Sequence, residues 1–185
     1  KSTFCRMLLP PELRMFYTDS FDLAAESQCE LRLTDCLLIN LDEFDRYSSH
    51  KQSTLKNLMQ MPSLRCRKAY ARNATTLPRV ASFIGTSNTP RLLTDPTGSR
   101  RFLCVELTHM IDVDTPICHA QLYAQCMHLL RNGERDHFTA DEVANIELRN
   151  RAYRLLPRVE QHFRAHFRHP EEGEQPQLLS AAEIH

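Results

Sequence analysis

The chain has 185 residues, a length that suits one domain, or one domain with a small appendage. Apolar residues make up 42% of the chain and charged residues 25%, which is enough apolar material for a hydrophobic core. The formal net charge is zero, so the overall charge points to no particular class of partner. No apolar run reaches about 18 residues and no signal peptide opens the chain, so we expect no membrane span.

The seven cysteines indicate the redox environment of the protein. Their number is odd, no two of them have C-x-x-C spacing, and most lie in apolar stretches. We therefore expect reduced thiols in a cytoplasmic protein. The chain opens with Lys1 and not with Met, and we expect it to be a piece of a longer protein.

The first part of the chain alternates predicted helices and strands. Residues 1–10 predict a short helix that is stopped by two consecutive prolines. Residues 13–19 predict a short strand, and residues 20–35 predict a helix with Ser20 as its N-cap candidate. The continuous apolar run CLLINLD, residues 36–42, predicts a strand that is buried on both faces of a parallel sheet.

The same alternation continues through the middle of the chain. Residues 44–60 predict a polar helix, and residues 65–79 form a basic segment without clear periodicity. VASFIGTSN, residues 80–88, predicts a second buried strand that ends in polar residues. Residues 89–100 predict a loop rich in Thr and Pro, and residues 101–107 predict a third apolar strand.

The last third of the chain is predicted to be helical. Residues 119–133 predict a helix that ends at Gly133. Residues 139–167 begin with T-x-x-E, the sequence form of a capping box, and predict a long helix with a kink at Pro157. Residues 169–179 are acidic and rich in helix breakers, and we expect a loop or a disordered tail there.

Helices that alternate with apolar strands predict an α/β fold with a parallel sheet, followed by a helical region. We expect the boundary between residues 1–114 and residues 115–185, which include the flexible tail. In parallel sheets, ligands bind beyond the carboxyl ends of the strands. Asp42, Glu43 and Asn88 all follow predicted strands, so we expect them to face one pocket.

The acid pair that follows residues 36–41 suits a nucleotide-hydrolysing site. Asp42 can hold Mg²⁺ or a water molecule bound to it, because hard cations prefer oxygen ligands. Glu43 can orient and deprotonate an attacking water. The alternative is a turn at the end of a strand, in which the two acids are only solvated.

Two further polar sites support a nucleotide pocket. KST at the start of a helix is the second half of the phosphate-binding loop G-x-x-x-x-G-K-[ST], in which the lysine reaches phosphate and the next hydroxyl binds Mg²⁺. The alternative is a chance tripeptide. Asn88 can contact the γ-phosphate or the lytic water, and the alternative is that it caps the next turn.

A pair of arginines follows the loop DPTG. The planar guanidinium groups of Arg100 and Arg101 suit phosphate, and an arginine delivered to a transferring phosphoryl group can raise the rate by about 10³–10⁵. The alternative is a surface pair that neutralises Asp95 or Glu106.

Taken together, KST, LLINLDEFD, the stretch from LKNLMQ to VASFIGTSN, and DPTGSRRFL resemble the virulence-associated protein E family. The resemblance covers about residues 1–107. It implies a P-loop NTPase core, a parallel sheet flanked by helices, similar to superfamily 3 helicases and phage primase-helicases. The first strand and the glycine-rich half of the phosphate loop are missing from this sequence, so we expect this chain alone to bind nucleotide poorly.

The resemblance also implies roles for single residues. It implies that Lys1, Ser2 and Thr3 belong to the ATP-binding motif, with Ser2 and Asp42 as Mg²⁺ ligands. It also implies that Asp42 and Glu43 correspond to the acidic Walker B pair of the family. The sensor asparagine and the paired arginines, one of which acts across a subunit interface, correspond to Asn88, Arg100 and Arg101.

Those roles imply hydrolysis of ATP coupled to remodelling or unwinding of DNA in phage or mobile-element replication. The implied partners are single-stranded or forked DNA and further copies of the full-length protein in a ring. The main alternative is a catalytically inactive ATPase relative that only binds DNA or a partner. A weaker alternative is an ATP-dependent regulator or loader with the same site.

The basic stretch from Lys51 to Thr94 contains no Asp or Glu. One interpretation is a solvated face. The other is a DNA-contacting track with an aromatic ring for base stacking, favoured because superfamily 3 helicases carry a DNA-contacting hairpin here. The candidate DNA contacts are Lys56, Arg65, Arg67, Lys68, Tyr70 and Arg72.

The segment HFRAHFRH spaces three histidines along one helix face, at His162, His166 and His169. Such spacing can bind Zn²⁺, but no acidic or cysteine ligand is adjacent. We favour a basic helical face.

Overall fold

The computed structural model describes all residues except 25, 68–72, 96–97, 172, 177–178 and 180–185. The chain forms two compact units, Lys1–Leu155 and Leu156–His185. The first unit therefore extends beyond the predicted boundary between residues 114 and 115.

A small parallel sheet lies at the centre of the first unit. It has the order β1-β2-β5, from β1 (Tyr17–Thr18), β2 (Leu38–Leu41) and β5 (Ser82–Gly85). Leu38 of β2 pairs with Tyr17 on one side and with Ser82 on the other. The prediction of an α/β fold with a parallel sheet is confirmed.

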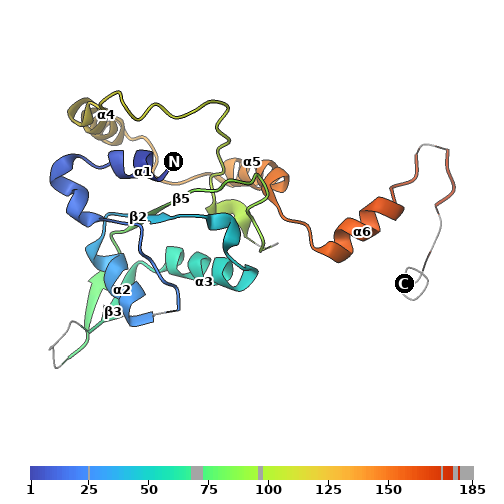
Figure 1. Cartoon of the computed structure of the whole chain (residues 1–185), viewed down its shortest axis with the longest axis horizontal. Helices are drawn as coiled ribbons and strands as arrows, with labels where there is room; N and C mark the ends of the chain where they lie inside the picture. Colours follow the sequence, from blue (N-terminus) through green and yellow to red (C-terminus); the bar gives the residue numbers. More distant parts are fainter. Residues whose placement is uncertain (25, 68–72, 96–97, 172, 177–178, 180–185) are drawn as a thin grey trace. The chain divides into compact units, whose positions relative to one another are not determined.

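Helices flank this sheet (Figure 1). Helices α1 (Ser2–Met7) and α4 (His119–Arg131) lie above it in that view, and α2 (Glu26–Asp35) and α3 (Ser49–Gln60) lie below. Two hydrogen bonds join the upper pair: His119 Nε2 to the Met7 carbonyl oxygen at 2.7 Å, and the Tyr123 hydroxyl to the Leu8 carbonyl oxygen at 3.3 Å.

The central strand β2 forms the middle of the hydrophobic core, since Ile39 and Leu41 are buried in it. Buried side chains from α2, α3 and both sheets complete the core, among them Leu33, Leu55, Leu64, Ala81 and Leu93. Burial of such side chains removes apolar area from water, which is the dominant favourable contribution to folding. The prediction of a buried strand in residues 36–42 is confirmed for Leu38–Leu41, whereas Asp42 is exposed after the end of the strand.

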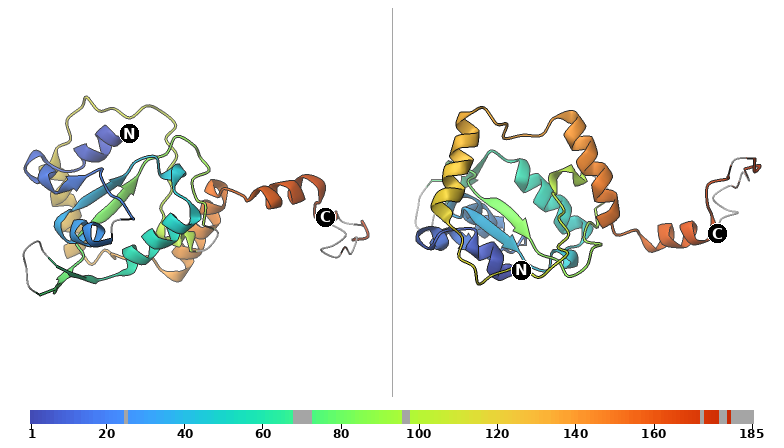
Figure 2. Two further views of the ribbon diagram at one scale, coloured as in Figure 1. Left: turned by 60° about the horizontal axis from the view of Figure 1, so that its bottom comes forward. Right: turned by 90° about the horizontal axis from the view of Figure 1, so that it is seen from above.

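The basic segment and the two residues before it contain an antiparallel pair of strands, which the residue pattern did not predict, although the resemblance implied a hairpin in this stretch. Strand β3 (Ser63–Cys66) pairs with β4 (Thr75–Pro78), with Leu64 opposite Leu77. Leu64 and Cys66 are buried while Ser63 and Arg65 are exposed, which is the period-two pattern of a half-buried strand. The hairpin extends away from the central sheet (Figure 2).

Several predicted elements begin or end elsewhere. Residues 13–19 form mostly a 3-10 turn, η1 (Pro11–Phe16), and only Tyr17–Thr18 is strand. Helix α2 begins at Glu26 and not near Ser20, and the Asp22 carboxylate accepts a hydrogen bond from the Ala24 N–H at 3.0 Å. Such side-chain turns compete with a helix start.

The prediction of a strand over residues 101–107 is wrong. Its first residue ends the 3-10 turn η3 (Ser99–Arg101), and residues 102–107 belong to no helix or strand in the described part of the chain. Phe102 and Cys104 pack against the core, whereas Leu103 and Val105 are exposed. The side chains alternate as in a strand, but no described neighbour supplies the hydrogen bonds of a ladder.

Strand β5 is less buried than predicted, because among the described strands only β2 pairs with it. Phe83 and Ile84 are half-buried, and Ser82 and Gly85 are exposed.

The predicted long helix over residues 139–167 is divided. Helix α5 (Ala140–Asn150) starts with the predicted capping box, in which Thr139 accepts from the Glu142 N–H and Glu142 accepts from the Thr139 N–H. The turn η4 (Arg151–Tyr153) follows it.

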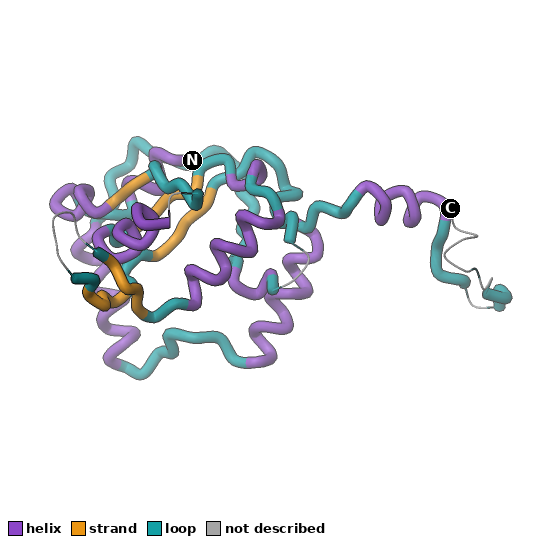
Figure 3. Tube along the Cα trace, turned by 90° about the horizontal axis from the view of Figure 1, so that it is seen from below, coloured by secondary structure: helices purple, strands orange, loops and turns teal. Residues whose placement is uncertain are grey.

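Figure 3 shows α4 and α5 joined by the loop of residues 132–139. Gly133 has a φ of 80°, consistent with the predicted helix end.

The second unit contains α6 (Arg158–His166), which starts after Pro157. The prediction of one long helix with a kink at Pro157 is wrong, because α5 already ends at Asn150 and Pro157 only precedes the first residue of α6. Phe163 and Phe167 stack with ring centroids 4.8 Å apart.

None of the described cysteines forms a disulfide bond. Cys5, Cys29, Cys36 and Cys66 are buried, and Cys118 and Cys126 are exposed. No helix in the described part of the chain is long and apolar enough to cross a membrane.

Candidate functional site

The carboxyl ends of β2 and β5 open into one pocket of about 280 Å³. Its walls come from the start of α1, the turn after β2 and the turn after β5. The lining residues are Lys1, Ser2, Asp42, Glu43, Thr86, Ser87 and Asn88. The structure therefore brings together the predicted polar sites from three separate stretches of sequence.

Asp42 is held in place by the neighbouring strand. Its carboxylate accepts hydrogen bonds from the Thr86 hydroxyl and from the Glu43 N–H, the latter at 3.2 Å. The hydrogen bond from Thr86 lowers the pKa of Asp42, the partial loss of solvation opposes it, and the Ser2 hydroxyl lowers it further. The carboxylate is therefore ionised at neutral pH and ready to accept a cation.

Glu43 has an unusual backbone conformation. Its φ is 50°, in the left-handed region, and among the described residues no other non-glycine residue has a positive φ. The turn is fixed by a hydrogen bond of 2.8 Å from the Phe44 N–H to the Thr86 carbonyl oxygen. Such conformations cost about 1–3 kcal/mol and are concentrated at functional sites. The Glu43 carboxylate forms an exposed ion pair of 2.6 Å with Arg46.

Lys1 reaches the end of β5 from the opposite wall. Its ammonium group donates to the Ser87 carbonyl oxygen and to Asn88 Oδ1, the latter at 3.1 Å. A lysine and an amide side chain that meet across a pocket can both contact an anion between them.

Ser2 and Asp42 offer a hydroxyl and an ionised carboxylate, which suit Mg²⁺ when a substrate phosphate supplies further oxygens. In the described part of the chain, His, Cys, Asp and Glu form no cluster of three or more that could hold a metal ion.

Three predicted site residues lie outside this pocket. Thr3 is exposed on α1. Arg100 and Arg101 belong to η3 and do not line the pocket.

The predicted DNA contacts separate into three groups. Arg65 and Arg67 are exposed at β3. Lys56 is not on that surface: its side chain is only 6% exposed and forms an ion pair with Asp95 inside the protein. Lys68, Tyr70 and Arg72 lie outside the described residues.

The histidine segment does not form a three-ligand face. His162 and His166 lie one turn apart on α6, with ring centroids 4.4 Å apart, and His166 Nδ1 lies 2.9 Å from the His162 carbonyl oxygen. His169 follows the end of the helix.

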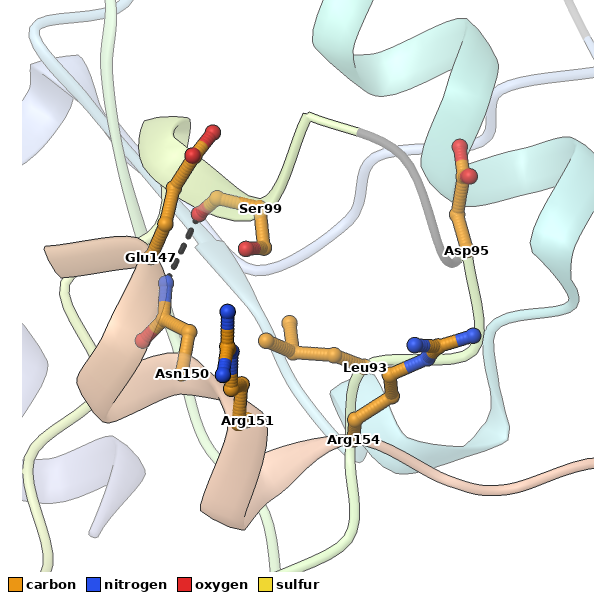
Figure 4. Close-up of a pocket in the computed structure, with 7 residues that line it drawn as sticks. All are labelled: Leu93, Asp95, Ser99, Glu147, Asn150, Arg151 and Arg154. Atoms are coloured by element: carbon orange, nitrogen blue, oxygen red, sulfur yellow. Dashed lines mark hydrogen bonds between the residues drawn. The ribbon is translucent and has the colours of Figure 1, made fainter. Parts of the chain in front are cut away.

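A second cavity of about 200 Å³ lies between α5 and the loop that carries the arginines (Figure 4). Its lining residues are Leu93, Asp95, Ser99, Glu147, Asn150, Arg151 and Arg154.

Sequence reasoning missed two residues of the first pocket, Thr86 and Ser87. Both belong to the polar ending TSN of the predicted strand, so the signal was present beside Asn88. It also missed the buried amides of Gln52 and Asn150. No local pattern distinguishes a buried amide from an exposed one on a polar helix.

Comparison with known proteins identifies a family and a similar solved structure. None of the curated proteins compared with the chain matches it. The apo A form of the NrS-1 C-terminal region is similar, with a TM-score of 0.43 and 16% sequence identity, and the match covers 83% of this chain and 31% of that chain. The family model for the virulence-associated protein E-like domain matches residues 1–155. This chain is thus a member of the virulence-associated protein E-like domain family.

Proposed function

We propose that the chain provides the ATP-hydrolysing site of a protein that remodels or unwinds DNA in phage or mobile-element replication. One observation carries the proposal. Lys1, Ser2, Asp42, Glu43 and Asn88, which the sequence motifs selected in advance, line a single pocket at the carboxyl ends of two parallel strands.

Each residue then has a role in the attack of water on the γ-phosphate. Lys1 neutralises charge on the β- and γ-phosphates, and Asn88 contacts the γ-phosphate from the end of β5. Ser2 and Asp42 hold Mg²⁺, which when bound neutralises charge that develops on the phosphate oxygens. Glu43 orients the water and accepts its proton, after release from Arg46.

The proposed fold is a P-loop NTPase core. In the full protein, the glycine-rich half of its phosphate-binding loop is proposed to precede Lys1. Backbone N–H groups of such a loop cradle phosphate and would complete the pocket wall beside Lys1.

The test is ATP hydrolysis by this chain and by a form extended upstream through the phosphate loop, each with and without single-stranded DNA. We expect turnover by the extended form. Glu43→Gln in that form removes the proton acceptor, so kcat falls by about 10²–10⁴-fold while ATP binding is retained. Glu106→Gln is the matched control, because Glu106 is exposed and far from the pocket residues in sequence.

A Glu43→Gln form that hydrolyses ATP at the parent rate would exclude the proposed role of Glu43. If neither form of the unmodified protein turns over ATP under any condition, the motor function is wrong. The exposed Arg65 and Arg67 of the β3–β4 hairpin then favour the second candidate, a DNA-binding module without catalysis.

A further inference from the structure

The second cavity, of about 200 Å³, shares no lining residue with the proposed ATP pocket. Leu93, which is 1% exposed, lines it from the chain that follows β5. Pockets that enclose a whole small molecule have volumes of roughly 300–1,000 Å³. A cavity of this size therefore suits a single chemical group of a larger ligand.

Main-chain hydrogen bonds fix one wall of the second cavity. The Leu93 N–H donates to the Tyr153 carbonyl oxygen at 3.0 Å, and the Leu155 N–H donates to the Leu93 carbonyl oxygen at 2.8 Å. Leu93 and Arg154 thereby form a parallel β-bridge. The backbone that carries Arg154 is thus held against a buried residue, so the side chain of this arginine starts from a defined position.

A buried amide fixes another wall. Asn150 of α5 is 3% exposed, and its Nδ2 donates to the carbonyl oxygens of Ser99 and Phe102 at 2.8 and 2.9 Å. Figure 4 shows the bond to Ser99. The Ser99 hydroxyl forms no hydrogen bond with the part of the chain that the structure describes. It can therefore donate to a group inside the cavity.

Two guanidinium groups line the cavity, those of Arg151 and Arg154, and they lie on either side of Leu93 in the view of Figure 4. Arg151 is exposed, and its side chain makes no hydrogen bond or ion pair with any described residue. Glu147 of α5 precedes Arg151 by one helical turn, but within the described part of the chain the two form no ion pair. The guanidinium group of Arg151 is therefore available to a ligand.

The charges around the cavity favour an anion. Asp95 is 9% exposed, and its carboxylate forms the buried ion pair with Lys56. In Figure 4 this carboxylate points away from Arg154. Among the described lining residues, Glu147 is then the one acid that opposes the two arginines. Planar guanidinium groups and a hydroxyl donor match the oxygen atoms of a phosphate group.

We propose that the second cavity binds one phosphate group in the backbone of a single-stranded nucleic acid. Arg151 is the main contact, and Arg154 and the Ser99 hydroxyl donate from the walls. The sugar and the base stay outside, because the cavity has room for one group only. Phosphate contacts supply most of the affinity in non-specific binding of nucleic acids, so this site adds to the contacts proposed for the β3–β4 hairpin. It does not depend on ATP hydrolysis.

The experiment measures binding of a fluorescent oligothymidylate to this chain by anisotropy over a salt series, without ATP. Arg151→Gln is expected to weaken binding by about 10-fold, because one charge-assisted contact is lost. The slope of log affinity against log salt is expected to fall by about 0.7–1, the effect of one phosphate. Arg149→Gln is the matched control: it removes the same charge from an exposed site on α5 that does not line the cavity, and we expect a much smaller change.

A second variant separates binding from damage to the fold. Glu147→Gln removes a negative charge beside the phosphate, and we expect it to strengthen binding by about 2–5-fold. A damaged fold weakens binding at both positions, whereas opposite effects at Glu147 and Arg151 require a ligand of negative charge between them. Melting temperatures of both variants are expected to equal that of the parent, since both side chains are exposed.

NMR of the arginine Nε–H groups identifies the source of the phosphate. The Arg151 signal is assigned by its loss in Arg151→Gln, and the chain is then titrated with oligothymidylate or with inorganic phosphate at equal ionic strength. We expect the oligothymidylate to shift this signal at concentrations at which inorganic phosphate does not. A shift with inorganic phosphate alone would overturn the nucleic acid as the ligand.

The remaining outcomes also decide the proposal. Equal losses in Arg151→Gln and Arg149→Gln show a general effect of charge and overturn the site, and so does a Glu147→Gln chain that binds no tighter than the parent. A chain that binds no oligothymidylate overturns it as well. Because no step uses ATP, an extended form that fails to hydrolyse ATP defeats the proposed function and leaves the evidence for this site intact.

Discussion

At the scale of single residues, Thr86 controls the charge of the acid end of β2. Thr86→Val removes the hydroxyl that donates to Asp42, so we expect the pKa of Asp42 to rise toward its ordinary value. A carboxylate whose pKa is lowered by folding stabilises the protein at neutral pH, and that contribution disappears as the pH falls through its folded pKa. NMR titration of the Asp42 carboxyl carbon measures the change directly.

Thr76→Val on the exposed face of β4 is the control, because it makes the same change away from the pocket. An Asp42 pKa that is equal in parent and Thr86→Val would contradict the importance of this hydrogen bond.

Single site residues could be predicted where their position at the end of a strand determines which pocket they line. Asp42 and Asn88 follow the ends of parallel neighbours, so their meeting could be predicted from the order of elements. Prediction failed for Lys56, because the sequence gives no sign that Asp95, 39 residues later, would lie beside it in the interior. Contacts of that kind depend on the tertiary fold and on no local pattern.

At the scale of elements, the capping box at the start of α5 has a measurable contribution. Thr139→Ala leaves the Glu142 N–H without its side-chain acceptor, and the expected loss is about 1 kcal/mol of unfolding free energy. For a unit of this size we expect the melting temperature to fall by about 2–4 °C. Thr108→Ala, an exposed loop change, is the control, and equal losses in both variants would argue against the cap.

The β3–β4 hairpin carries the prediction about DNA. Charge reversal of Arg65 and Arg67 is expected to weaken binding of single-stranded DNA and to reduce the slope of log affinity against log salt by about 1 for each phosphate that the variant no longer neutralises. Fluorescence anisotropy over a salt series measures both quantities. Arg14→Glu, at an exposed site on η1, makes the same change in net charge as each single reversal and is the control for it. An unchanged affinity and slope would remove the hairpin from the DNA-binding surface.

Helices and strands could be predicted where the residues of the element itself determine its structure. β2 is a continuous apolar run, and its burial on both faces follows from that run. The run of residues 101–107 looks similar, but a strand also needs a hydrogen-bonding neighbour, which the sequence of the run does not specify. The residue pattern missed the strands of the hairpin, since β3 buries only Leu64 and Cys66, which is too short an alternation to recognise. Only the resemblance implied a hairpin in this stretch.

At the scale of the whole molecule, the family match and the first compact unit both end at residue 155. We therefore expect a chain that ends at Leu155 to unfold with the same cooperative transition as the full chain. Calorimetry of the two forms checks this. A large fall in melting temperature on truncation would show that the second unit contributes to the stability of the first.

The division at residue 155 was not predicted because composition changes earlier, near residue 114, where strands give way to helices. Packing decides the boundary instead. Asn150 of α5 bonds to Ser99 and Phe102, and Leu155 donates to the Leu93 carbonyl oxygen, so the helical segment up to that point belongs to the first unit.

The distribution of the cysteines makes the natural protein suitable for spectroscopic labelling. Maleimides react with thiolates, and burial raises the pKa of Cys5, Cys36 and Cys66, and that of Cys104 to about 11. At neutral pH we expect two labels per folded chain, at Cys118, which precedes the first residue of α4, and at Cys126 near the middle of that helix. Mass spectrometry counts them, and further fast labelling would show that the core opens.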